Sequence, residues 1–162
     1  MVILKALLLA VSVTFLTACQ GISKPQVERA VPDRAYFENL VQQRYVQPFR
    51  AGEVDVWLQA FDADAIALHN LRPADRGVEA IEGFGLAVHQ YFKLDQYDVR
   101  ITDVRFSQQW VYTVGEYTTH FVNKADGKAP WGIDHGKFVL LWELGEDGVW
   151  RIILDMGNSN TP

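Results

Sequence analysis

Cysteine is nearly absent from this chain, which has 162 residues and a single cysteine at position 19. One cysteine can form neither a disulfide within the chain nor a cysteine-based zinc site. The four histidines follow none of the short spacings that bind a metal ion, and they are His69, His89, His120 and His135. We therefore expect no metal site.

Clusters of positive charge are also missing. The formal net charge at pH 7 is −5, and no stretch of the chain concentrates lysine or arginine. Because proteins that bind a phosphate backbone present a basic patch, we expect no nucleic-acid partner. The sequence also lacks a glycine-rich phosphate loop, a G-x-S-x-G elbow and a dinucleotide-binding fingerprint. We expect no cofactor.

The first 18 residues have the pattern of a secretory signal peptide. Lys5 precedes an apolar run from Ala6 to Leu16. This run is shorter than the roughly 20 residues that a helix needs to cross a bilayer, and it fits the charged and apolar regions of an export signal.

The signal ends in a sequence, Leu16-Thr17-Ala18-Cys19, that resembles the lipobox of bacterial lipoproteins. The resemblance implies cleavage before Cys19 and attachment of diacylglycerol to its sulfur, with fatty acids such as palmitate as the membrane anchor. Gln20, in place of aspartate, implies the outer membrane, facing the periplasm, rather than the inner membrane. The alternatives are an uncleaved anchor and an ordinary signal peptide with a chance cysteine.

Residues 19–32 show no hydrophobic periodicity and contain glycine, serine and proline, so we expect a flexible tether. Residues 33–162 have the length and composition of one globular domain.

Three helices are expected in the first half of this domain. Apolar residues recur at helical spacing from Asp33, a predicted cap, to Arg50, and Gly52 ends that helix. A short helix is expected over residues 53–61, followed by a strand over 65–69, and a third helix over 77–92.

Long strands are expected in the second half. Residues 97–107 and 110–123 alternate between the two faces of a strand, and Gly115 within the second suggests a bulge or bend. Residues 136–143 and 149–156 form a predicted hairpin around Asp147-Gly148. Both arms of this hairpin are apolar on both faces, so both faces need cover, one from helices and the other from a second subunit.

The order of these segments resembles the SnoaL-like/DUF4440 domains of the NTF2-like superfamily. The resemblance is carried by the passage from Trp57 to Ala65, by Gly77-Val78-Glu79-Ala80-Ile81, and by the hairpin with its ending Leu154-Asp155-Met156-Gly157-Asn158. It implies an α+β, cystatin-like fold in which a curved antiparallel sheet wraps around three helices as a cone with a pocket. It implies no particular reaction, because the superfamily contains both enzymes and non-catalytic modules.

Asp155 is the main catalytic candidate, because a carboxylate at the end of an apolar strand can serve as a general base or acid. The alternative is a structural carboxylate that bonds to the backbone near Asn158. Strict alternation places Trp150 and Asp155 on opposite faces, so Asp155 faces the helices only if a bulge intervenes. His135 and Tyr36 are the candidate hydrogen-bond partners.

Aromatic residues and one histidine are the candidates for ligand binding: Tyr36, Trp57, His69 and Trp131. Core packing is the alternative for the tryptophans, and a structural or solvated role is the alternative for each histidine.

The sequence therefore predicts an envelope lipoprotein whose pocket domain binds a small apolar ligand or a protein partner without catalysis, and which forms a homodimer through its sheet. The alternative is an isomerase or dehydratase of the ketosteroid isomerase-like class, with Asp155 as the base.

Overall fold

The computed structural model describes residues 32–161. The predicted signal peptide, lipidated cysteine and nearly all of the predicted tether lie outside these residues. Within them, no helix is both long enough and apolar enough to cross a membrane.

The domain begins with one continuous helix, divided into α1 (Arg34–Leu40), a π-helical segment η1 (Val41–Val46) and α2 (Gln47–Ala51). The Asp33 side chain accepts a hydrogen bond from the Tyr36 backbone N–H at 2.9 Å, which confirms Asp33 as the cap. Gly52 ends the helix in a left-handed conformation with φ of 79°.

The π-helical segment precedes Pro48. Within it, the backbone N–H of Gln47 bonds to the carbonyl of Gln42, five residues earlier. Proline has no backbone N–H and its ring collides with the carbonyl four residues before it in a regular α-helix. Wider winding before Pro48 relieves this conflict, and Tyr45 lies in the widened segment.

Two further helices complete the helical layer, α3 (Val54–Leu58) and α4 (Val78–Tyr91). They meet where Gly85 of α4 lies against Trp57 of α3. A Cβ atom at Gly85 would come within 3.0 Å of the indole ring, so glycine allows this close contact.

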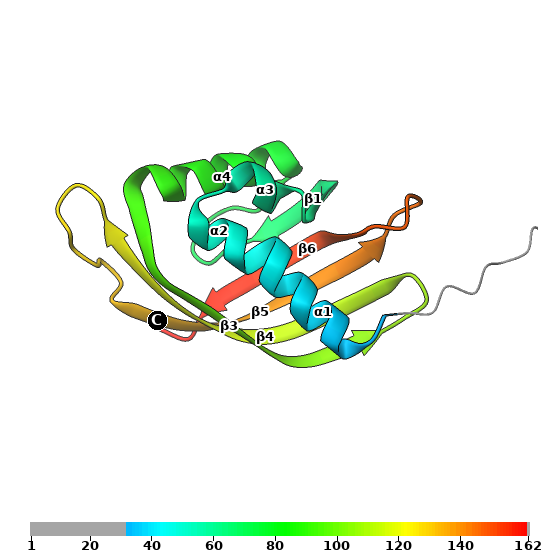
Figure 1. The fold of residues 1–162 in the computed structure, drawn as a ribbon. Coiled ribbons are helices and arrows are strands. Elements are labelled where there is room, and N and C mark those ends of the chain that lie inside the picture. The colour runs from blue at the N-terminus through cyan, green and yellow to red at the C-terminus, as the bar shows by residue number, and fades with distance from the viewer. Residues whose placement is uncertain (1–31, 162) are drawn as a thin grey trace, which may run out of the picture. The chain divides into compact units, whose positions relative to one another are not determined.

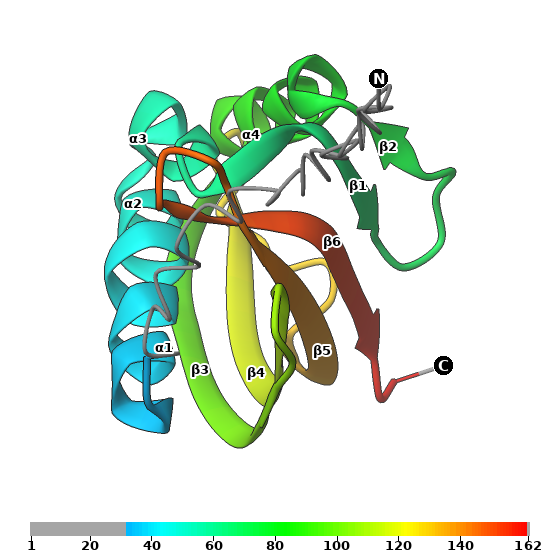
Figure 2. The ribbon, with the colours of Figure 1, turned by 90° about the vertical axis from the view of Figure 1, so that its right-hand side faces the viewer.

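A six-stranded sheet forms the rest of the domain, in the order β2-β1-β6-β5-β4-β3. The strands are β1 (Phe61–Leu68), β2 (Asp75–Arg76), β3 (Phe92–Phe106), β4 (Trp110–Asn123), β5 (Ile133–Leu144) and β6 (Trp150–Ser159). Figures 1 and 2 show the sheet curving around the helices, as predicted for the α+β fold.

The sheet is mixed rather than wholly antiparallel, because β1 runs parallel to β6. All other neighbours are antiparallel. The predicted hairpin forms, and β4 has the predicted bounds. The pairing of β3 with β4 shifts register opposite Gly115, but the extra residue is Thr102 of β3, so the bulge lies in the strand that pairs with Gly115 and not in β4 itself.

The core lies between the helices and the concave face of the sheet. Phe37 of α1 meets Trp150 and Trp142 with ring centroids 5.2 and 6.1 Å apart. The Trp142 indole donates a hydrogen bond to Thr113 Oγ1 at 3.2 Å. Trp142 and Trp150 therefore belong to the hydrophobic core.

Candidate functional site

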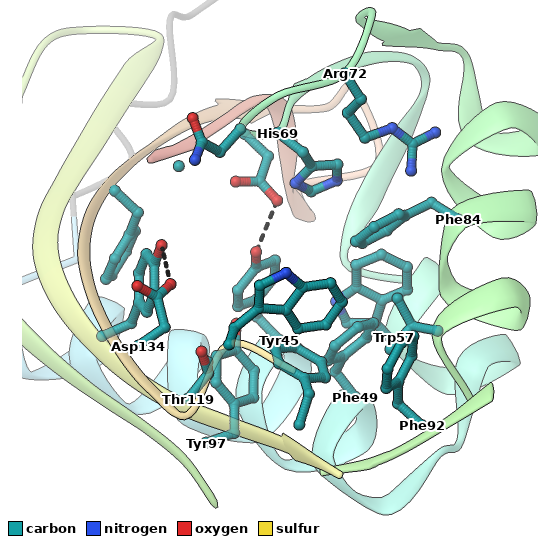
Figure 3. A pocket seen from close by; sticks show the side chains of 18 residues that line it. Tyr45, Phe49, Trp57, His69, Arg72, Phe84, Phe92, Tyr97, Thr119 and Asp134 are labelled. Carbon is teal, nitrogen blue, oxygen red and sulfur yellow. Dashed lines mark hydrogen bonds between the residues drawn. The ribbon is translucent and has the colours of Figure 1, made fainter. Parts of the chain in front are cut away.

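A cavity of about 280 Å³ opens between the helices and the concave face of the sheet (Figure 3). Most of the side chains that line it are aromatic: Tyr45, Phe49, Trp57, Phe84, Phe92, Tyr97, Tyr117, Phe121, Trp131 and Phe138. Polar groups are few, so the cavity has the apolar walls and sparse polar contacts of a small-molecule site.

Asp155 faces this cavity because of a bulge in β6. Leu141 pairs with Leu154 but Trp142 pairs with Ile152, so Ile153 is an extra residue in the strand. The extra residue reverses the alternation, and Trp150, Ile152 and Asp155 are all buried toward the helices. The bulge that the sequence required for an inward Asp155 is present.

Tyr45 donates a hydrogen bond from its hydroxyl to Asp155 Oδ2 at 2.7 Å. Burial raises the pKa of the Asp155 carboxyl, while nearby His69 and the bond from Tyr45 act in the opposite direction. Burial and the neighbouring Asp155 raise the pKa of Tyr45. Its hydroxyl therefore stays protonated and can serve as the hydrogen-bond donor.

His69 lies beside this pair, at the end of β1 (Figure 3). Its ring stacks on Phe84 with centroids 4.1 Å apart. Burial lowers the pKa of His69, although Asp155 and Asp75 raise it in part. Its Nε2 is buried without a hydrogen-bond partner among the described residues, and so is the Trp57 Nε1. Two lining side chains thus carry nitrogen atoms that have no hydrogen-bond partner in the part of the chain that the structure describes.

Asp134 lines the cavity on another side, as Figure 3 shows. Its Oδ2 accepts a hydrogen bond from Tyr117 at 3.2 Å and its Oδ1 accepts one from Ser159 at 2.5 Å. Burial is the main cause that raises the pKa of Tyr117, and the nearby Asp134 carboxylate raises it further. Gly136 makes room for this tyrosine, since a Cβ atom at Gly136 would lie 2.0 Å from the Tyr117 ring.

Trp57, His69 and Trp131 line the cavity, whereas the candidates Tyr36 and His135 do not. Trp131 is 62% exposed and meets Phe92 with centroids 5.1 Å apart.

The structure does not place Tyr36 or His135 as partners of Asp155. Adjacent residues of a strand face opposite sides, so His135 points away where Asp134 points in, and it is hydrogen-bonded to Thr118 at 3.0 Å. Tyr36 is 44% exposed and packs edge-on against Phe37.

Tyr45, Tyr97 and Arg72 are lining residues that the sequence did not single out. Tyr45 was counted in the apolar face of the first helix, and Asp134 adjoined the selected His135. Among the described residues, no group of three or more histidine, cysteine or carboxylate side chains is arranged to hold a metal ion.

Comparisons with known proteins identify the fold. No protein-family model matches the chain, and no curated protein sequence does either. The chain is similar to a ketosteroid isomerase-like protein from Erwinia carotovora atroseptica, with a TM-score of 0.68 and 17% identity over 76% of this chain and 94% of that one. It is also similar to an NTF2-like superfamily protein from Salmonella enterica, with a TM-score of 0.65 and 13% identity over 77% and 91% of the two chains.

An NTF2-like protein from Cytophaga hutchinsonii has a TM-score of 0.64 and 8% identity, over 79% of this chain and 99% of that one. These similarities confirm the predicted NTF2-like fold. At such identities they establish the fold alone, and the SnoaL-like/DUF4440 assignment stays a prediction.

Proposed function

We propose that this NTF2-like domain binds one small, largely apolar ligand in its aromatic cavity, without changing it chemically. The observation that supports this function is the cavity itself, in which aromatic walls surround the Tyr45–Asp155 pair and two unpartnered nitrogen atoms. A flat ligand with one polar atom gains apolar contact with the rings and a hydrogen bond to one of these polar groups.

Isothermal titration calorimetry with 2-naphthol tests the proposal, because this probe joins a flat apolar body to a single hydroxyl. We expect one site per domain in the wild type. Phe84→Ala, which removes a lining ring, weakens binding about tenfold or more, the equivalent of about 1.4 kcal/mol. The control Leu86→Ala removes an exposed side chain of α4 outside the cavity and keeps the affinity. Equal affinities in all three proteins would contradict binding in this cavity.

A second candidate function is isomerisation of a β,γ-unsaturated ketone, with Asp155 as the base. The buried carboxyl, its raised pKa and its contact with Tyr45 favour this chemistry. Asp155 would take a proton from the carbon between the carbonyl and the double bond, and would return it to the far end of the conjugated enolate. Ultraviolet absorbance of the conjugated ketone follows the reaction, and activity lost in Asp155→Asn would support catalysis over binding alone.

We also propose that two copies of the domain associate through the outer face of the sheet. Tyr112 pairs with Leu141 of β5, which pairs with Leu154 of β6, and Val139 pairs with Met156. These residues alternate with buried ones, so their side chains lie on the face away from the helices. Tyr112 and Met156 are exposed and the other three residues are half-buried, so this face carries an apolar patch that a second copy could cover.

Attachment of the protein to the cell envelope remains part of the proposal. It is supported by the apolar run from Ala6 to Leu16 and the lipobox-like ending at Cys19. An outer-membrane position facing the periplasm is supported by Gln20.

A further inference from the structure

Arg72 is the one lysine or arginine among the residues that line the cavity. It lies in the loop between β1 and β2, and its guanidinium carbon is 4.8 Å from the centre of the Phe84 ring. Figure 3 shows Arg72, Phe84 and His69 gathered on the same side of the cavity. Asn70 of the same loop, another lining residue, adds an amide N–H₂ group.

Asp75 holds the guanidinium in place. Arg72 Nη2 donates a hydrogen bond to Asp75 Oδ1 at 2.7 Å, and Asp75 is only 8% exposed. A guanidinium has five N–H donors, and this is the only hydrogen bond that Arg72 makes among the described residues. With the Arg72 side chain 37% exposed, water rather than protein is available to the remaining donors.

Both carboxylates of the cavity accept hydrogen bonds from the protein itself. Asp155 accepts a hydrogen bond from Tyr45, and the two oxygens of Asp134 accept from Tyr117 and Ser159. An anionic group at Arg72 would replace only water and would meet a planar donor whose orientation is already fixed.

We infer that the ligand of this cavity is an amphipathic organic acid, whose carboxylate binds Arg72 and whose flat apolar body lies among the aromatic rings. This inference rests on the proposed ligand-binding function and specifies the chemical class of the ligand.

Three probes with one skeleton test it by calorimetry: 2-naphthylacetate, 2-naphthylacetamide and 2-(2-naphthyl)ethylamine. The wild type is expected to bind the carboxylate about tenfold more tightly than the amide, the effect of roughly one charge-assisted hydrogen bond. Arg72→Gln is expected to remove this preference, so that the carboxylate and the amide bind with similar affinity. The matched control Arg76→Gln changes the net charge equally at an exposed site outside the cavity and keeps the preference.

The outcomes separate this inference from the function on which it rests. Amide binding equal to that of the carboxylate, or tightest binding of the amine, overturns the organic-acid inference but supports the cavity as a binding site. Equal loss of carboxylate affinity in both arginine variants shows a general charge effect and also overturns it. If none of the three probes binds at millimolar concentration, both the inference and the proposed function are contradicted.

Discussion

Tyr45 and Asp155 lie 110 positions apart in the sequence, yet the tyrosine hydroxyl donates a hydrogen bond of 2.7 Å to the aspartate carboxyl in the interior of the domain. One residue comes from the widened turn before Pro48 and the other follows the bulge at Ile153. Two local irregularities thus bring these two side chains together in a cavity whose walls are mostly aromatic.

Asp155 makes the stability of the domain depend on pH. Its pKa is raised in the folded state, so its contribution is fully present below the unfolded pKa of about 3.9 and is lost as pH rises through the folded pKa. Between these two values the wild type loses about 1.4 kcal/mol of unfolding free energy per pH unit from this group. Urea unfolding at several pH values is expected to show this loss in the wild type and not in Asp155→Asn.

Two variants give this prediction its controls. Tyr45→Phe removes a hydrogen bond that stabilises the charged carboxyl, so the decline extends to higher pH than in the wild type. Asp126→Asn, in an exposed loop, keeps the wild-type decline. The same slope in Asp155→Asn and the wild type would show that other groups cause it.

Gly136 is needed because Tyr117 occupies the space of its missing side chain. Gly136→Ala places a Cβ atom 2.0 Å from the tyrosine ring, which must move and lose its bond to Asp134. We expect a loss of about 1–3 kcal/mol in unfolding free energy. Gly83→Ala is the contrasting variant, because no atom lies within 4 Å of its added Cβ, and it is expected to gain about 0.5–1 kcal/mol. A destabilised Gly83→Ala would contradict the open space beside Gly83, and an unchanged Gly136→Ala would contradict the close contact of Gly136 with Tyr117.

Leu141 lies near the middle of the apolar outer face of the sheet, between Tyr112 and Leu154. Leu141→Lys places a charge in the proposed interface and is expected to convert a dimer into a monomer in light scattering at micromolar concentration. Ser107→Lys, in the turn between β3 and β4, makes the same charge change away from this face and is expected to remain dimeric. A monomeric wild type at this concentration would contradict the proposed dimer.

Cys19 is the predicted lipid attachment site. Cys19→Ser is expected to release the protein from the membrane fraction of the producing cell, because a serine hydroxyl cannot form the thioether. Mass spectrometry of the mature wild type checks the same point, with the expectation of an N-terminal Cys19 bearing lipid. A mature protein that begins at Met1, or one with an unmodified cysteine, would contradict the anchor.

Local signals in the sequence predicted most of the secondary structure. Asp33 and Gly52 marked the ends of the first helix, and Asp147-Gly148 marked the turn of the last hairpin, because each acts on a few neighbouring residues. The pairing of β1 with β6 joins strands far apart in the chain, so no tight turn between them indicates that they pair or that they run parallel.

The site was less predictable because its residues depend on register. The first arm of the hairpin begins at Ile133 rather than at the predicted Gly136, so Asp134 and His135 both lie within the strand. Strand alternation then turns Asp134 toward the cavity and His135 away from it. Asp155 was selected from its apolar neighbours, but its inward direction depended on a bulge that the sequence does not mark. Tyr45 was hidden because an aromatic residue on a helix face is usually core packing.

The parallel pairing of β1 with β6 also determines when the domain can be completed. During synthesis, β1 leaves the ribosome well before β6, the strand that covers its inner edge. Until residues 150–159 have emerged, β1 has no partner on that edge and Tyr45 has no carboxyl to bond. The cavity can therefore be completed only after β6 has been made. Deleting β6 alone would separate β1 and β2 from the other strands, because β6 lies inside the sheet and not at its edge.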